Sequence, residues 1–414
     1  MRVWIFQTGE PLPGDSTDFR SMRAMNLTKS LLLKGHKVVL WSSQFDHINK
    51  QQRDFSEIEW SENLEIRLVP SRGYKSTISF TRIFDHMELA FNLRKMLRNQ
   101  KPPDVLFVGF PPIESSWILM RWASRMKVPT MLDVKDDWPA IILRLFPKYV
   151  RPLGKVAVLP YKLMMLQTFK LASGISSISH SFLEMCISRT KRSLQEFDKV
   201  AYLTQEERSF GVSEIESASD WLDERGVNDD QKFRISYIGS LTRALDFECL
   251  LHAAQNPKFN FVIAGDGPIL SGLRQKFKAL PNVIFLGWIT STQASVLQKR
   301  STVMWAPYVD SPDFLLSLPN KFFDSMANRK PIVTSLSGVA GKLILDREIG
   351  FTYSNSDVSS LHALLTNIET KKPILYEYGD NARKLFELEF SFEKVYGDLV
   401  LSLESLARKS MEEK

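Results

Sequence analysis

Cysteine is scarce in this 414-residue chain, and its scarcity excludes several classes of protein. Cys186 and Cys249 lie far apart and outside any C-x-x-C or metal-ligand spacing, which argues against a disulfide framework or a zinc site. No run reaches the ~18 uninterrupted apolar residues of a spanning helix, and the chain begins with a strand-like RVWIF rather than a signal peptide. We therefore expect a protein of the reducing cytoplasm, neither exported nor membrane-spanning.

Carboxylates are missing from one long segment, and the charge of the whole chain is uneven. Residues 138–183 contain no Asp or Glu. The first 203 residues carry 30 Lys and Arg against 19 Asp and Glu, a net +11, whereas the remainder carries 24 against 28, a net −4. This asymmetry indicates that the first half meets an anionic surface or substrate, such as nucleic acid, phospholipid or pyrophosphate.

Length and composition predict two folded domains. The chain is 44% hydrophobic and 24% charged and has no low-complexity tract, which is typical of a folded soluble protein. It is too long for one ordinary hydrophobic core. Two domains of about 200 residues fit best, since typical domains have roughly 100–200 residues.

Short apolar runs alternate with helical patterns along both halves. The first half contains VWIF, HKVVLWS, PDVLFVG, PTMLDV and GISSIS, and the second contains RISYIG, NFVIAGDG, NVIFLG, VMWAPY and PIVTS. Such alternation predicts an α/β fold of two doubly wound, Rossmann-like domains that face each other across a cleft. We expect these parts: an N-terminal domain at 1–203, an acidic solvated connector at 204–231, a C-terminal domain at 232–390, and a final helix at 391–414 that packs back on the first domain.

A glycine-rich turn follows one strand of the second half. In FVIAGDGP, Gly265, Asp266 and Gly267 let the backbone turn tightly and approach a ligand. The spacing from Gly265 is G-x-G-x-x-x-x-G rather than the dinucleotide G-x-G-x-x-G, so we do not infer NAD. A plain strand-to-helix turn is the alternative.

The segment SLPNKFFDSMANRKPIVTS predicts a phosphate site at the beginning of a helix. Leu318, Asn320 and Lys321 stand at the helix amino terminus, where unpaired N–H groups and the helix dipole favour a phosphate. Asp324, one turn later, is placed to accept hydrogen bonds from the vicinal hydroxyls of a ribose. The alternative is that Asp324 only complements the helix dipole. Arg243, after the strand RISYIG, is a second candidate for clamping a diphosphate, or else a solvated arginine.

Two segments near the amino terminus are candidates for a second ligand. TGEPLPGDSTDFRSMR is a loop that leads into a helix and contains Gly9, Glu10 and Arg20. In WSSQFDHINKQQR, His47, Lys50 and Arg53 would share one helical face if the segment were helical. Ordinary surface loops are the alternative for both.

The acid-free segment combines cations with large apolar residues. Its candidate lipid-facing cations are Arg144, Lys148, Arg151, Lys155 and Lys162. Interleaved cations and apolar side chains suit a segment that lies in a headgroup region. A partly buried helix pair with snorkelling lysines is the alternative.

With these motifs in order, the chain resembles a family 4 glycosyltransferase of the GT-B fold, in the branch that builds lipid-linked surface polysaccharides. The resemblance spans nearly the entire chain. In the first half it depends on GEPLPGD, LLLKGHKVVLWSSQFDH, PPDVLFVGFPP and VPTMLDVKDDWP. In the second half it depends on YIGSLTRALDF, FVIAGDGP, NVIFLGW and LPNKFFDSMANRKPIVTS.

The resemblance implies that the second domain holds a donor nucleotide sugar and the first mainly an acceptor. It implies that Arg243 and Lys321 hold the donor diphosphate, that Asp324, the second acid of an E-x7-E motif, holds the ribose, and that Gly265 to Pro268 and Gly287 with Trp288 surround the nucleoside. It also implies metal-independent transfer with retention of configuration. No two aspartates stand at D-x-D spacing, which is the metal-nucleotide signature of the other large glycosyltransferase fold.

Two positions depart from the family pattern. Leu316 stands where the first acid of E-x7-E is expected, and Asp313 is a candidate substitute. The usual His-Asp pair of the first domain is replaced by Lys135 and Asp136, which we take as the catalytic candidates: the lysine for departing phosphate charge and the aspartate for orienting the acceptor hydroxyl.

The function hypothesis is a retaining glycosyltransferase, cytoplasmic and peripheral on the inner face of the cytoplasmic membrane. It would move a sugar, UDP-linked and N-acetylated or deoxy, to a polyprenyl-diphosphate-linked acceptor in lipopolysaccharide or capsule biosynthesis. The expected partners are the nucleotide sugar, the lipid-linked acceptor and an anionic membrane, with no metal, cofactor or nucleic acid. The alternatives are a nucleotide-sugar 2-epimerase and a non-catalytic nucleic-acid-binding or scaffold protein.

Overall fold

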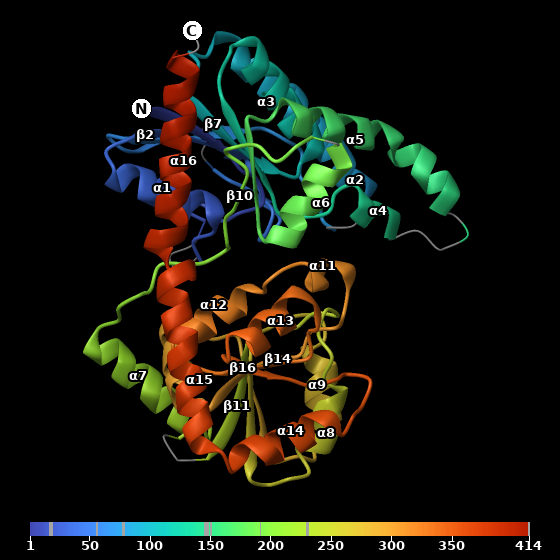
Figure 1. The fold of residues 1–414 in the computed structure, drawn as a ribbon, viewed down its shortest axis with the longest axis vertical. Helices are drawn as coiled ribbons and strands as arrows, with labels where there is room; N and C mark the ends of the chain where they lie inside the picture. The colour runs from blue at the N-terminus through green and yellow to red at the C-terminus, as the bar shows by residue number, and fades with distance from the viewer. Residues whose placement is uncertain are drawn as a thin grey trace. The chain divides into compact units, whose positions relative to one another are not determined.

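The chain forms two compact units in the computed structural model (Figure 1). Unit 1 comprises Met1–Leu203 and Val395–Lys414, and unit 2 comprises Thr204–Lys394. The structure describes residues 1–15, 20–54, 57–76, 79–144, 149, 151–190, 192–228 and 232–412.

Unit 1 is built on an eight-stranded sheet with the order β10-β9-β8-β7-β1-β2-β6-β5. Its strands are β1 (Arg2–Phe6), β2 (Lys37–Ser43), β5 (Glu57–Ser61), β6 (Leu64–Val69), β7 (Val105–Phe110), β8 (Thr130–Val134), β9 (Gly174–Ser177) and β10 (Lys199–Val200). Neighbouring strands are parallel except β5 and β6. All six residues of β7, VLFVGF, are buried, because strands of a parallel sheet are covered on both faces.

Helices and a small hairpin complete unit 1. The hairpin pairs β3 (Phe45–Asp46) with β4 (Gln51–Gln52). The helices are α1 (Arg23–Leu33), α2 (Phe80–Met96), the 3-10 turn η1 (Leu97–Asn99), α3 (Ile113–Arg125), α4 (Ala140–Arg144), α5 (Arg151–Leu171), α6 (His180–Thr190) and α16 (Phe392–Glu412).

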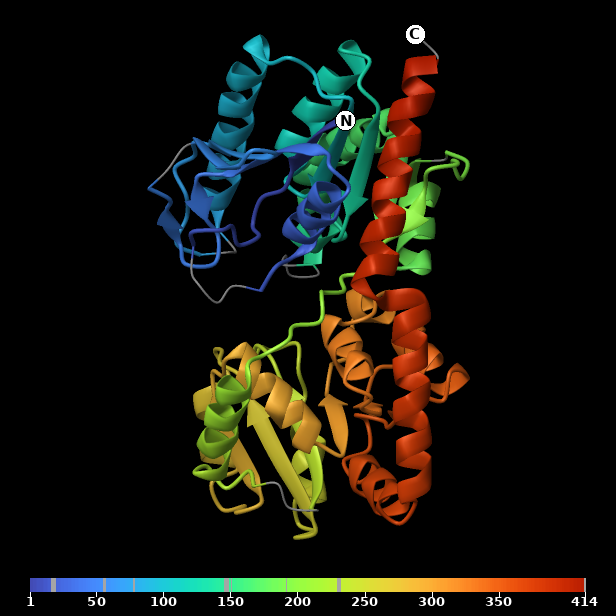
Figure 2. The same cartoon turned by 90° about the vertical axis from the view of Figure 1, so that its left-hand side faces the viewer.

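Helix α16 belongs mostly to unit 1 (Figure 2). Its side chains and main chain bond with residues far away in the sequence. Asn26 Nδ2 of α1 donates to Tyr396 Oη at 3.2 Å, and His36 Nε2 lies 2.8 Å from Glu404 Oε1. Lys199 Nζ of β10 donates to the carbonyl oxygen of Asp398 at 2.8 Å. The last helix is therefore tied to both α1 and the edge of the sheet.

Unit 2 is built on a six-stranded, fully parallel sheet with the order β13-β12-β11-β14-β15-β16. Its strands are β11 (Phe233–Ile238), β12 (Phe259–Ala264), β13 (Val283–Gly287), β14 (Val303–Ala306), β15 (Ile332–Thr334) and β16 (Gly350–Thr352). Its helices are α7 (Val212–Asp223), α8 (Glu248–Ala253), α9 (Leu270–Lys276), α10 (Ser291–Arg300), α11 (Pro312–Leu315), α12 (Asn320–Ala327), α13 (Gly338–Asp346), α14 (Ser360–Glu369), α15 (Lys372–Leu385) and the π-helix η2 (Phe386–Phe390).

The acidic segment, expected to be a solvated connector with a short helix, contains α7 and is mostly exposed over the residues described, 204–228. Ala218 and Leu222 of α7 are buried in one cluster with Val262 of β12 and Leu297 of α10, so one face of this helix packs on unit 2. The acids of α7 are exposed on its outer face, as in an amphipathic helix.

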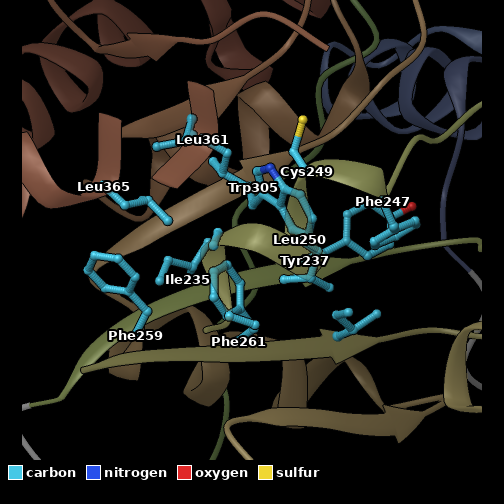
Figure 3. Packing of buried hydrophobic residues seen from close by; sticks show 14 of the residues in the cluster. Ile235, Tyr237, Phe247, Cys249, Leu250, Phe259, Phe261, Trp305, Leu361 and Leu365 are labelled. Carbon is cyan, nitrogen blue, oxygen red and sulfur yellow. The ribbon is translucent and has the colours of Figure 1, made fainter. Parts of the chain in front are cut away.

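An aromatic-rich core lies on one face of the unit 2 sheet (Figure 3). Trp305 of β14 meets Phe247 and Phe261 edge to face, with ring centroids 5.3 and 6.0 Å away, and its Nε1 donates to Tyr353 Oη at 3.1 Å. Each such buried aromatic contributes roughly 1.5–3 kcal/mol through area removed from water. This packing holds the strands whose carboxyl ends carry the site described next.

Candidate functional site

The strand order of unit 2 reverses between β11 and β14. β12 and β13 follow β11 on one side, whereas β15 and β16 follow β14 on the other. Loops that leave the carboxyl ends of two such strands diverge to opposite faces of the sheet, and ligands of open α/β sheets bind in the crevice that results. The residues that follow Ile238 and Ala306 therefore define the first place to look for a site.

Glycines bring the loops after β11, β12 and β13 close together at this edge. A Cβ on Gly265 would lie 1.9 Å from the carbonyl oxygen of Gly239, so no other residue fits there without a shift of the backbone. The loops are joined by backbone hydrogen bonds from Gly239 N to Ala264 O at 2.9 Å, Leu241 N to Asp266 O at 2.8 Å and Gly265 N to Gly287 O at 2.6 Å. The edge is thus made of closely packed main chain rather than side chains.

Lys321 of α12 reaches this glycine edge. Its Nζ lies 4.8 Å from the ring centroid of Tyr237, and a Cβ on Gly239 would come within 1.8 Å of it. Tyr237 donates its hydroxyl to Ser240 O at 2.7 Å, and burial raises its pKa, so the phenol stays neutral. An ammonium therefore sits beside main-chain groups at the end of β11, as a phosphate-binding site requires.

Helix α12 presents its candidate residues on one face. Phe322, Phe323 and Met326 are buried, which leaves Lys321 and Asp324, three positions apart, on the half-buried side. Pro319 precedes the helix and provides no side-chain cap, and its carbonyl oxygen accepts from Phe322 N at 2.9 Å. Leu318 is buried and Asn320 half-buried, and both anchor this beginning of the helix.

Arg243 is exposed on a loop that is anchored at both ends. Leu241 N bonds to Asp266 O, and Val309 N donates to Ala244 O at 3.0 Å, so the loop after β11 is tied to the loops after β12 and β14. The side chain of Arg243 is at the surface of the same edge.

The position expected to carry the first acid is half-buried and apolar. Leu316 directly follows α11, and the side chain of Asp313 lies outside the described residues. The acid that the structure does describe on this loop is Asp310, whose Oδ2 accepts from Ser337 Oγ at 3.2 Å. Asp310 carries no motif in the sequence and was not among the predicted site residues.

Gly287 and Trp288 end β13 at the same edge. Gly287 O accepts from Gly265 N, and the indole of Trp288 is 64% exposed. Asp266 is exposed, and its Oδ1 accepts from Gly267 N at 2.7 Å. An indole this exposed at the rim offers an aromatic face for stacking.

In unit 1, Glu10 and Lys135 form a pair at the carboxyl end of the sheet. Lys135 Nζ lies 2.5 Å from Glu10 Oε1 and 4.0 Å from Asp133 Oδ2. Glu10 is buried, and its Oε2 accepts from Ala24 N at 2.9 Å in the first turn of α1. Asp133 also faces Arg23, whose Nε is 3.4 Å away, and both of these side chains are fully buried.

Asp136 and Lys135 differ in burial. Asp136 is exposed in the turn after β8, whereas its neighbour Asp137 is buried and pairs with Arg189 of α6. The structure thus places Lys135 with Glu10 and leaves Asp136 at the surface.

The segment with His47, Lys50 and Arg53 is a hairpin, so the helical alternative for it is wrong. Asp46 Oδ1 accepts from Ile48 N at 2.8 Å and from Asn49 N at 3.2 Å, which forms a turn between β3 and β4. Lys50 has a left-handed backbone with φ of 57°. Arg53 is buried and bonds to Asp15 with two 2.6 Å contacts.

Gly9 lies beside the imidazole of His47. A Cβ on Gly9 would lie 3.9 Å from His47 Cδ2, and Gly9 has φ of +76°. Arg20 is exposed.

The cations predicted to face lipid lie on or before α5. Lys155 and Lys162 are exposed, and Arg151 is half-buried at the first position of the helix. Arg144 ends α4, with its side chain outside the description, and Lys148 lies outside the described residues. Among the helices that the structure describes, none is both long and apolar enough to cross a bilayer.

Sequence reasoning missed Gly239, Tyr237 and the Arg23–Asp133 pair. The signal for Gly239 was its place directly after a strand in YIGS; the other two became visible only through contacts between distant segments. Within the described ranges, no three His, Cys, Asp or Glu side chains gather as a metal site would require.

Residues 232–369 match the model of a protein family described as glycosyl transferases group 1. This range lies within unit 2 and contains Gly239, Gly265, Lys321 and Asp324. No curated protein matched the chain.

The chain is similar to solved structures along its whole length. Sucrose-phosphate synthase from Thermosynechococcus elongatus has a TM-score of 0.72 at 14% identity, with 100% of both chains covered. HepE from Anabaena in complex with UDP-glucose has a TM-score of 0.64 at 14% identity, and the match covers 98% of this chain and 100% of that one. WaaG, a glycosyltransferase involved in lipopolysaccharide biosynthesis, has a TM-score of 0.63 at 13% identity, and the match covers 96% of this chain and 98% of that one. The chain therefore has the GT-B fold, and the predicted class of two Rossmann-like α/β domains is confirmed.

Proposed function

We propose that this protein is a glycosyltransferase that takes its sugar from a nucleotide diphosphate sugar bound by unit 2. The observation that carries the proposal is the position of Lys321 Nζ beside Gly239, at the switch point of a parallel sheet. The match of residues 232–369 to glycosyl transferases group 1 supports it. The similarity to HepE, solved with UDP-glucose, supports a UDP-linked donor. The proposed sugar is N-acetylated or deoxy, as hypothesised from the sequence.

In the proposed reaction the bond between the anomeric carbon and the diphosphate oxygen breaks. Lys321, Arg243 and the positive end of the α12 dipole stabilise the charge that develops on the departing diphosphate, without a metal. The acceptor hydroxyl attacks from the face of the leaving group, so configuration is retained, and its proton passes to the departing phosphate. Asp136 orients the hydroxyl, and no covalent nucleophile takes part.

The proposed acceptor is a saccharide linked to a polyprenyl diphosphate and bound by unit 1, in lipopolysaccharide or capsule biosynthesis. Helix α5 supports a location on the inner face of the cytoplasmic membrane, because Leu153, Val156 and Leu163 are exposed beside Lys155 and Lys162. Such a surface gains from apolar contact and from about 1 kcal/mol per cation near anionic lipid.

Helix α2 adds a second exposed apolar stripe. Phe80, Phe84, Met87 and Phe91 are all more than half exposed and recur at helical spacing. Like α5, α2 packs against α3, so both stripes belong to one helical layer of unit 1. Apolar stripes of this kind on a water-exposed protein mark an interaction surface.

The donor site is tested by calorimetry with UDP and a panel of nucleotide sugars, followed by assays of hydrolysis and transfer. The parent chain should bind UDP or another nucleotide diphosphate, and Lys321→Ala and Asp324→Ala should each lose most of that affinity and of the transfer. Lys330→Ala, in the loop after the same helix, is unsuitable as a control because Lys330 bonds to two carbonyls, so the exposed Lys299→Ala is the matched control. Wild-type rates in both site variants would refute the proposal.

The membrane location is tested by flotation with vesicles of phosphatidylglycerol. Val156→Glu and Leu163→Glu, which place charge on the apolar face of α5, should leave the protein unbound. Tyr376→Glu, at an equally exposed position of unit 2, should float as the parent does. Equal flotation of all variants would exclude α5 as the membrane contact.

Leu316 favours one second candidate, a non-catalytic scaffold of the same fold, because an acid is missing from the position expected to grip the donor sugar. This candidate predicts nucleotide binding without hydrolysis, isomerisation or transfer. NMR of the donor after incubation separates the outcomes, because an isomerised sugar in a lipid-free mixture would instead indicate an epimerase.

A further inference from the structure

An arginine of α9 lies close to the last residue of β13, at the carboxyl edge of the unit 2 sheet. A Cβ on Gly287 would lie 3.5 Å from Nη2 of Arg274, which belongs to the last turn of α9. Gly287 has φ of +75° and no side chain, so the guanidinium lies close to the main chain there. The end of β13 therefore carries a guanidinium as well as the exposed indole of Trp288.

Buried side chains on either side of Arg274 fix its position on the sheet. Leu273 and Phe277 of α9 both belong to the aromatic-rich core. The ring of Phe277 lies 6.2 Å, centroid to centroid, from that of Phe285, which is two residues before Gly287 on β13. Residues three apart on a helix and two apart on a strand lie on the same side of each element. The contact of Phe277 with Phe285 therefore places Arg274 at Gly287, one step nearer the carboxyl edge.

The guanidinium of Arg274 is not used by the protein itself. Its side chain is exposed, and no residue in the described ranges forms a hydrogen bond, an ion pair or a ring contact with it. Two acids of adjoining elements bond elsewhere: Asp266 Oδ1 accepts from Gly267 N at 2.7 Å, and Glu248 of α8 pairs with Lys276 at 2.5 Å. The N–H donors of Arg274 are therefore available to a ligand.

Arg274 lies at a different part of the edge from Lys321. Lys321 reaches Gly239 at the end of β11, Arg274 lies at the end of β13, and β12 separates these two strands. Since neighbouring strands are about 4.8 Å apart, the two strand ends are separated by about 10 Å. A nucleotide whose diphosphate contacts Lys321 therefore presents another of its parts to Arg274. The exposed indole beside it suits the flat base.

A guanidinium distinguishes bases by what their edges accept. It donates hydrogen bonds and accepts none, so it pairs with carbonyl oxygens and opposes amino groups. Arginine bonds to base carbonyls in this way when proteins recognise nucleic acids. Uracil has carbonyl oxygens at positions 2 and 4 of its ring, whereas cytosine has an amino group at position 4. A donor-only group beside the base therefore favours uracil.

We propose that Arg274 determines which nucleobase the donor carries, by donating a hydrogen bond to a carbonyl oxygen of a base that stacks on Trp288. This inference rests on the proposed function, whose donor it describes more closely. Lys321 holds the diphosphate at the end of β11, and the base lies at the end of β13. Arg274 is thus a specificity-determining residue that takes no part in the transfer itself.

The test is calorimetry on the full chain with UDP, CDP and inorganic pyrophosphate. Arg274→Met should weaken UDP binding by about tenfold or more, because the bond to the base is lost, and should leave pyrophosphate binding unchanged. Arg274→Lys keeps the charge without the planar fork and should not restore the UDP affinity. The control Lys278→Met removes another exposed cation soon after α9 and should bind every probe like the parent.

The probes separate contact with the base from contact with the phosphates. In Arg274→Met, a loss of UDP affinity alone indicates the carbonyl at position 4, and a loss for UDP and CDP together indicates the carbonyl at position 2. An equal loss of pyrophosphate affinity would make Arg274 a phosphate ligand and overturn the inference. Unchanged UDP affinity in Arg274→Met would overturn it as well.

Failure of the proposed function gives a different result from failure of this inference. A parent chain that does not bind UDP contradicts the donor site as a whole, and the role of Arg274 falls with it. A parent that binds UDP as tightly as Arg274→Met does leaves the donor site intact and removes only Arg274. Melting curves of the variants should match the parent, because the side chain of Arg274 is exposed.

Discussion

In unit 2 the strand β11 lies beside β14, and in unit 1 the strand β1 lies beside β7, so each sheet has a switch point of the same kind. The carboxyl edge in unit 2 is main chain brought close by Gly239 and Gly265. The corresponding edge in unit 1 is filled by side chains: Gln7 Oε1 occupies the space where Gly109 lacks a Cβ, and Glu10 pairs with Lys135.

This difference shows how one topology serves two roles. A bare edge, made of main chain with the ammonium of Lys321 beside it, suits a ligand that carries its own charge close to the backbone, such as a diphosphate. A filled edge leaves recognition to side chains rather than to the main chain. The fold is the same in both units and therefore does not tell which ligand each unit binds. The residues at each carboxyl edge decide this.

The largest effect on stability is expected in unit 1, at the carboxyl edge that side chains fill. Arg23→Met would remove the buried guanidinium beside Asp133, which keeps Ser176 Oγ at 2.7 Å and Lys135 Nζ at 4.0 Å, together with the bonds of Arg23 to the carbonyl oxygens of Ala201 and Tyr202. This change should lower the free energy of unfolding by about 3–5 kcal/mol. Urea unfolding followed by circular dichroism measures it. The control Lys34→Met should stay within about 0.5 kcal/mol of the parent. Equal stability of the two variants would mean that the buried pair contributes little.

The second largest effect on stability is expected at the bare edge of the unit 2 sheet. Gly265→Ala puts a Cβ against Gly239 O at a φ of +138°, which should destabilise unit 2 by about 2–3 kcal/mol. Gly272→Ala in α9 meets nothing within 4 Å and should be neutral or stabilising by up to about 1 kcal/mol. Thermal or urea unfolding compares them. Equal free energies of unfolding for the two alanine variants would show that the close approach of the loops does not stabilise unit 2.

The stability of unit 1 should depend on pH through Glu114 of α3. The pKa of Glu114 is raised from 4.5 to about 7, so the folded state favours its protonated form. The advantage of the parent over Glu114→Gln should therefore fall as pH rises from about 4.5 through 7, by roughly 2–3 kcal/mol. His86 and His47 titrate in the opposite sense, but they are present in both proteins and largely cancel. A pH-independent difference would contradict the raised pKa.

The smallest effect is expected at the rim of unit 2. Trp288→Ala should weaken UDP binding by about tenfold, since stacking on a base contributes about 1–3 kcal/mol, and should leave stability nearly unchanged. Trp60→Ala, which removes a comparably exposed indole from β5, should not affect UDP affinity. Equal losses of UDP affinity in the two variants, measured by calorimetry, would contradict a contact between Trp288 and the nucleoside.

The sequence predicted the strands well, because parallel strands buried on both faces appear as uninterrupted apolar runs. It left open whether His47 and Lys50 stand on a helix or in a surface loop, and the structure gives a hairpin whose turn is held by Asp46. It predicted a short helix in the acidic segment but not that one face of α7 packs on the sheet of unit 2, since an amphipathic helix rich in acids has the composition of a linker.

The sequence by itself determined the alternation of strands and helices, the glycines of the bare edge and the amphipathic helix α12, because these follow from local periodicity and from backbone freedom. The tertiary structure alone decided that Lys321 lies at Gly239, that Lys135 pairs with Glu10, and that Lys50 and Arg82 lie over the ring of Tyr74. Such contacts join residues far apart in the chain, and their energy depends on packing and burial that no local pattern encodes.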